Sequence, residues 1–176
     1  MGKPRDPKPA KLISSLISSS DDLIHFALEI MGERLGEIDF KSPPLPFHWT
    51  TYYDREMGKG LMRRLVSFRE LVPREELVRI KLWTNRLEEL FSQNGKRRLN
   101  VDPGYITQHH LILATTKEAP HRPYLGEGIY ADLTLIYRYG KFEPLRWTYP
   151  DYASEEMREM LEGIRRTYLG QLRRRG

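Results

Sequence analysis

Three side chains that could hold an anion stand within six residues of one another: Lys117, His121 and Arg122. Lys117 is a point charge, His121 carries an imidazole that can donate or accept a proton, and Arg122 presents a planar fork of N–H donors. Together they suit a phosphate or carboxylate group. The loop 117–124 therefore predicts an anion site in which Lys117 and Arg122 neutralise the charge and His121 donates or accepts a proton. The alternative is an exposed hairpin stiffened by two prolines.

The strand predicted at 129–139 has one polar face. Strict alternation sends Tyr130, Asp132 and Thr134 to that face, and apolar residues such as Leu133 to the other. Asp132 would orient a hydroxyl group or a metal ion, and Tyr130 would supply an apolar wall with a polar tip. We expect this face to line a cavity. The alternative is the solvated side of an antiparallel sheet.

Further candidates come from distant parts of the chain. Tyr52 and Glu56 belong to a long aromatic loop, and loops of this length are often functional. Arg97 and Asn100 precede Asp102 by a few residues, so all three side chains could reach the rim of the same cavity. Residues 102–104, Asp-Pro-Gly, predict a type II turn. With His121 and Asp132, Asp102 completes the set that could carry out acid–base chemistry.

A stripe of polar residues runs along the second predicted helix. Lys81, Asn85 and Glu88 lie at i, i+4 and i+7 and therefore share one face. Such a stripe is usually solvated. The neighbouring Trp83 and Thr84 leave room for the less common alternative, a pocket wall.

Composition excludes several kinds of site. The chain has no cysteine, which rules out disulfides, thiolate nucleophiles and iron–sulfur clusters. His109 and His110 would diverge on a strand, and no Asp-x-Asp motif occurs. We therefore assign no metal ligands and leave the cofactor unknown. Magnesium held by Glu56, Asp102 or Asp132 stays an open alternative.

The net charge of +5 and the pI near 9.4 arise at the chain ends. Residues 1–11 carry four basic side chains and one acidic one, residues 164–176 carry five arginines and no acid, and the part between has a net charge of −3. We expect a flexible basic segment at 1–11, one domain at 12–172 and a basic tail at 173–176. Lacking a signal-peptide pattern and any apolar run of about 20 residues, the protein is expected in the cytoplasm with no membrane partner. Its oligomeric state is left open.

Apolar spacing predicts an α+β protein. Helices are expected after Ser20, from Pro73 and after Ser154, where apolar residues recur every three or four positions. Strands are expected at 12–17, 37–41, 61–71, 99–101, 111–116, 129–139 and 142–147. The first six elements follow the order βαββαβ. We therefore predict a ferredoxin-like core with an antiparallel β extension and a C-terminal helix.

Four strings carry a family resemblance: 51–58 (TYYDREMG), 100–105 (NVDPGY), 121–124 (HRPY) and 147–152 (WTYPDY). In this order they resemble a prokaryotic family catalogued as domain of unknown function 4416, over about residues 11–172. Some members are labelled as GTP-binding proteins. A P-loop requires G-x-x-x-x-G-K-[ST], and this sequence contains no such string. The resemblance therefore indicates relatives without indicating a mechanism.

Three functional hypotheses follow. The first is a polar pocket for a small anionic ligand that is phosphate-bearing or nucleotide-like, with or without catalysis. The second is an RNA or ribonucleoprotein binding module that uses Tyr130, Tyr137 and Tyr139 for stacking and the basic termini for phosphates. The third is a protein-interaction domain whose aromatic loop is the interface. Whether the protein is an enzyme is left undecided.

Overall fold

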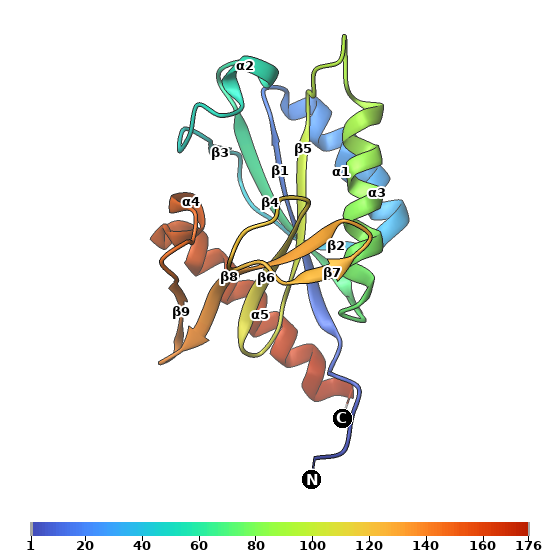
Figure 1. Cartoon of the computed structure of the whole chain (residues 1–176), viewed down its shortest axis with the longest axis vertical. Helices are drawn as coiled ribbons and strands as arrows, with labels where there is room; N and C mark the ends of the chain where they lie inside the picture. Colours follow the sequence, from blue (N-terminus) through green and yellow to red (C-terminus); the bar gives the residue numbers. More distant parts are fainter. Residues whose placement is uncertain (1, 176) are drawn as a thin grey trace.

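The computed structural model describes residues 2–175, which form a mixed α/β structure around an open antiparallel sheet (Figure 1). Its elements are, in chain order, β1 (Ala10–Ser18), α1 (Asp21–Leu35), β2 (Ile38–Lys41), β3 (Leu45–Pro46), α2 (Asp54–Met57), β4 (Met62–Val72), α3 (Glu76–Leu90), β5 (Asn100–Ile106), β6 (His110–Thr115), β7 (Tyr124–Gly126), β8 (Ile129–Arg138), β9 (Lys141–Pro144), α4 (Pro150–Ala153) and α5 (Glu155–Arg175).

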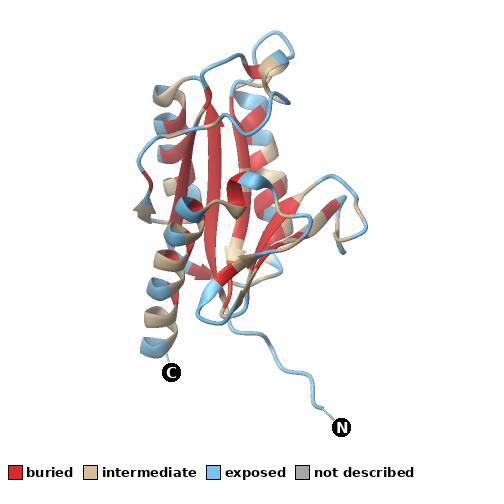
Figure 2. Ribbon diagram, turned by 90° about the vertical axis from the view of Figure 1, so that its left-hand side faces the viewer, coloured by how far each residue is buried: buried red, intermediate tan, exposed pale blue. Residues whose placement is uncertain are grey.

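The described strands form one nine-stranded sheet. The main path runs β2-β4-β1-β5-β6-β8-β7, while β3 pairs with β4 and β9 pairs with β8. Every pairing is antiparallel. The central strands are buried along most of their length, as expected for a sheet covered on two faces (Figure 2).

Helices pack on both faces of the sheet because the apolar residues of its central strands alternate. Leu12 of β1 belongs to a cluster with α1 and α3, whereas the adjacent Ile13 belongs to a cluster with α5. In β4, Val66 likewise belongs to the cluster with α1 and α3, and the adjacent Leu65 belongs to the cluster with α5. The sheet is thus the middle layer between α1 and α3 on one side and α5 on the other.

The predicted limits of α1 and the predicted start of α5 are confirmed, whereas α3 begins at Glu76, three residues after Pro73. The Ser20 hydroxyl caps α1 by accepting from the backbone N–H of Leu23 at 3.3 Å, and Gly36, with φ of 99°, ends the helix. The Ser154 hydroxyl accepts from the backbone N–H of Met157 at the start of α5. Apolar stripes located all three long helices, and serine caps located the starts of α1 and α5.

Both predicted terminal boundaries are wrong by a few residues. β1 begins at Ala10, so Lys11 is a buried strand residue whose ammonium pairs with Asp39 and donates to Gln171. At the other end, α5 continues to Arg175, so residues 173–175 are helical. A lysine on an otherwise exposed basic segment gives no sign of a carboxylate 28 residues later, which explains the first error.

The type II turn predicted at residues 102–104 is also wrong, because all three lie inside β5. On the β1 side Asp102, Pro103 and Gly104 pair with Ser15, Ser14 and Ile13. On the β6 side pairing starts only at Gly104, opposite Leu113. Pro103 has no N–H to donate and therefore fits where β6 has already turned away.

A bulge overturns the strict alternation expected for β8. Leu111 pairs with Leu135 and Ile112 with Leu133, so Thr134 is an extra residue without a partner on β6. Leu133 therefore packs on the α3 side, whereas Leu135 packs against α5. The polar face predicted for β8 therefore ends at Thr134.

Candidate functional site

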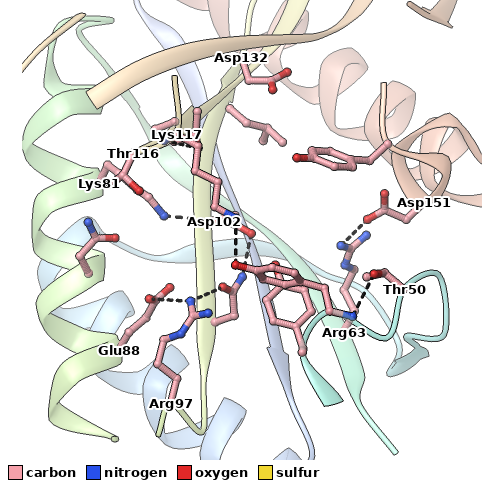
Figure 3. Close-up of a pocket in the computed structure, with 18 of the residues that line it drawn as sticks. Thr50, Arg63, Lys81, Glu88, Arg97, Asp102, Thr116, Lys117, Asp132 and Asp151 are labelled. Carbon is pink, nitrogen blue, oxygen red and sulfur yellow. Dashed lines mark hydrogen bonds and ion pairs between the residues drawn. The ribbon is translucent and has the colours of Figure 1, made fainter. Parts of the chain in front are cut away.

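A cavity of about 690 Å³ lies where β5 and β6 part. Beyond the pair of Gly104 and Leu113, β6 continues beside β8 and leaves residues 100–103 of β5 open on that side. The gap is bordered by α3, by residues 49–53 and by residues 149–152. Figure 3 shows side chains from all of these segments turned toward the hollow.

A chain of polar contacts crosses the inner wall. The Lys81 ammonium lies 3.3 Å from Oδ1 of Asp102 and donates to the carbonyl of Val101 at 3.1 Å. Asn100 donates to Oδ2 of Asp102 at 2.7 Å and accepts from Arg97 at 3.0 Å. Lys81 reaches from α3 to the open edge of β5, and Asn85 and Glu88 of the same helix also line the cavity, so the pocket-wall alternative for this helix describes the structure.

Arg97 joins this wall to the aromatic loop. Its guanidinium donates twice to Glu56, at 2.8 Å in each case, and it lies 3.5 Å from Glu88. The hydrogen bonds from Arg97 hold the pKa of Glu56 below its usual 4.5. Burial raises the pKa of Glu88, whose Oε1 accepts from the backbone N–H of Val101 at 2.6 Å. Glu56 thus fixes the loop to the cavity without lining it.

The Glu56–Arg97 pair should give a pH-dependent contribution to stability. Because folding lowers the pKa of Glu56, its contribution is complete above about pH 4.5 and is lost as the pH falls through the lower folded-state value. We expect Glu56→Gln to reduce the free energy of unfolding by about 1 kcal/mol at pH 7. The difference from wild type should shrink in urea unfolding below pH 4.5; a difference that stays constant to pH 2.5 would contradict this account.

The floor of the cavity holds a buried ion pair. Arg63 of β4 and Asp151 of α4 are 2.5 Å apart, and both side chains are less than a tenth exposed. The Arg63 guanidinium also lies between the rings of Phe47 and Tyr152, 4.7 and 5.1 Å from their centroids.

Three buried polar atoms near this pair have no hydrogen-bond partner within the described residues: Ser15 Oγ, Arg63 Nε and the Tyr152 hydroxyl. Burial, foremost, raises the pKa of Tyr152, while the Arg63 charge and the nearby Ser15 hydroxyl lower it.

The donors of Arg122 are used in hydrogen bonds within the protein. It donates to Asp132 at 2.8 Å, to the carbonyl of Lys117 at 3.1 Å and to the Tyr149 hydroxyl at 3.0 Å. It therefore lines the cavity as a brace between the loop and the segment before α4. Lys117 is exposed and has a different role. Among residues 2–175, the one hydrogen-bond and cation–π partner of its ammonium is Tyr52, 3.1 Å away at the hydroxyl and 4.5 Å away at the ring centroid.

The structure divides the residues predicted for the site. Seven line the cavity: Tyr52, Arg97, Asn100, Asp102, Lys117, Arg122 and Asp132. Asp132 is buried beneath Arg122 and also accepts from Thr134 at 3.1 Å. His121 lies 3.4 Å from Asp132 but stacks on Trp147 outside the lining.

The other predicted residues lie beside the cavity. Thr134 is at the bulge, and Tyr130 packs against Tyr124, 5.2 Å between centroids. The three proposed acid–base residues therefore do not converge: Asp102 lies on the inner wall, while Asp132 and His121 lie across the cavity beneath the loop (Figure 3 for the two aspartates).

Sequence reasoning missed the floor residues Arg63, Asp151 and Tyr152. Arg63 lies in a strand whose irregular alternation hid its buried position, and the short helix α4 was not predicted. The string WTYPDY at 147–152, noted only for its resemblance, was the one signal available.

Neither a metal cluster nor a membrane span is found in the part of the chain described. No group of three or more His, Asp or Glu side chains in residues 2–175 could hold a metal ion. No helix in the same range is both long and apolar enough to cross a bilayer.

Neither the curated proteins nor the solved structures gave a match. A family model described as Domain of unknown function (DUF4416) matches residues 8–168, a range that contains the whole β sheet and every segment lining the cavity. The chain therefore belongs to the DUF4416 family.

Proposed function

We propose that the cavity between β5 and β6 binds a small anionic ligand, with phosphate as the favoured anion. Five cations line it, and four of them already face a carboxylate: Arg63, Lys81, Arg97 and Arg122. Within residues 2–175, the ammonium of Lys117 forms no ion pair. This unpaired charge at the cavity wall is the observation that carries the proposal.

The surroundings of Lys117 suit a ligand that also has an apolar face. Trp49, Tyr52 and Tyr149 line the cavity and are each at least 40% exposed. Their rings could cover the flat or C–H side of a bound molecule while Lys117 holds its anion. The proposal concerns binding, since His121 and Asp132 are engaged elsewhere.

A thermal-shift titration tests this function. Inorganic phosphate, pyrophosphate, ribose 5-phosphate and AMP should raise the melting temperature in a concentration-dependent way, because a ligand that binds only the folded state stabilises it. Lys117→Glu should weaken this binding about tenfold or more. The matched control is Lys141→Glu on β9, which is exposed and distant from the lining. A wild-type protein that no anion stabilises, or equal shifts in Lys117→Glu and wild type, would refute the proposal.

The RNA hypothesis receives less support from the geometry. The Arg165 guanidinium covers the ring of Tyr137, with its carbon 3.3 Å from the ring centroid, while Tyr139 is an exposed turn residue. Tyr130 packs on Tyr124. These three tyrosines share no open face on which bases could stack.

We also propose that the unit from β1 to β5 is a ferredoxin-like core. Support comes from the antiparallel order β2-β4-β1-β5 and from α1 and α3 sharing one apolar cluster. The strands β6 to β9 then extend this core, and the ligand cavity opens at the junction.

A further inference from the structure

The inner wall and the floor of the cavity, called here the polar wall, have hydrogen-bonding groups that the protein does not use. Asn85 of α3 lines the cavity, and its amide makes no hydrogen bond within residues 2–175. Tyr152 also lines it and is 4% exposed; its hydroxyl lies near that of Ser15, and neither oxygen makes a hydrogen bond of normal geometry among the same residues. An amide and a phenol can each both donate and accept. A buried polar group without a partner costs free energy, so the Tyr152 hydroxyl indicates that a ligand completes the cavity. The Asn85 amide is half-buried and is free to hydrogen-bond the same ligand.

Asp102 adds acceptors between them. Its side chain is 34% exposed, and each oxygen accepts one contact, from Lys81 at 3.3 Å and from Asn100 at 2.7 Å. A carboxylate has about four lone-pair positions. About two therefore remain for donors that approach from the cavity.

The charge of this wall selects what can approach. Lys81 is neutralised by Asp102, Arg63 by Asp151, and Glu88 adds a further carboxylate to the lining. A second anionic group here would meet these carboxylates at close range. Neutral O–H groups would not, and they can donate to Asp102 while exchanging hydrogen bonds with Asn85 and Tyr152.

We propose that this wall binds hydroxyl groups, so that the ligand is a phosphorylated sugar or polyol. Its phosphate would lie at Lys117, its hydroxyls at Asn85, Asp102 and Tyr152, and its C–H face against Tyr52 or Trp49. This assignment rests on the proposed anion-binding function and names the chemical class of its ligand.

Two variants separate a binding role from a structural one. Tyr152→Phe and Asn85→Ala each remove an unpartnered group, so the ligand-free protein should melt at the wild-type temperature or above it. Affinity for ribose 5-phosphate and glycerol 3-phosphate, measured by calorimetric titration, should fall about threefold to tenfold in each variant. Affinity for inorganic phosphate should not change. Tyr139→Phe, at an exposed turn, is the matched control.

The outcomes are distinguishable. If ribose 5-phosphate binds wild type more tightly than inorganic phosphate and the variants remove that advantage, the assignment holds. If the two probes bind equally, or if Tyr152→Phe melts several degrees lower while still binding ribose 5-phosphate normally, the hydroxyl assignment is overturned and the anion site stands. If no phosphate compound binds wild type, both proposals fall.

Discussion

Replacing Gly104 with alanine is expected to lower the free energy of unfolding by about 3 kcal/mol. A Cβ atom at this position would lie 2.4 Å from the carbonyl oxygen of Ile112, and 2.7 and 3.2 Å from Cδ2 and Cα of Leu113. Two of these atoms belong to the backbone of β6, which cannot rotate away. Alanine would therefore force β6 from β5 at the pair where the cavity begins.

Urea unfolding of Gly104→Ala and Gly163→Ala measures this effect against a matched control. At Gly163, in α5, the nearest atom to a new Cβ is the Nη2 of Arg166 at 3.7 Å. Alanine there should leave stability unchanged or raise it by up to about 1 kcal/mol, because it is the better helix former. A Gly104→Ala protein as stable as wild type would show that β5 and β6 are not held at this separation.

Arg63→Met should cost about 3 to 5 kcal/mol of stability. The substitution leaves the carboxylate of Asp151 buried at 8% side-chain exposure without its cation. The cation–π contacts of Arg63 with Phe47 and Tyr152 are lost as well. The floor of the cavity should therefore loosen along with the fold.

The double variant Arg63→Met/Asp151→Asn shows whether the pair itself is responsible. Removing both charges should recover part of the loss, because no uncompensated carboxylate remains. Arg69→Met serves as the surface control, since Arg69 and Glu37 are both more than half exposed, and its stability should stay close to that of wild type. Equal losses in the single and double variants would contradict an electrostatic origin.

Much of the fold could be predicted because its signals are local. The apolar stripe of α1, its Ser20 cap and its Gly36 end are all read within 17 residues of sequence. The strands 61–71 and 129–139 were located by their composition to within one residue of β4 and β8. Local pattern thus determined both limits of α1, β2, β4, β6 and β8 to within one residue.

The candidate site was predictable only in part because it depends on pairings between distant residues. The string Asp-Pro-Gly at 102–104 is typical of a turn, and only the close approach of β6 explains these residues as part of a strand. The bulge at Thr134 could not be predicted, because apolar and polar residues alternate in the sequence of β8 without interruption at this position. Arg63 was overlooked since its partner Asp151 follows 88 residues later, in a helix of four residues.

The most direct test of the central claim is to map amide chemical shifts of the labelled protein by NMR as ribose 5-phosphate is added. The account predicts that the perturbed amides gather at residues 49–53, 85–88, 100–104, 114–117 and 149–152, the segments that surround the gap between β5 and β6. Perturbations confined to residues 2–9 and 173–175, or none at saturating ligand, would contradict it.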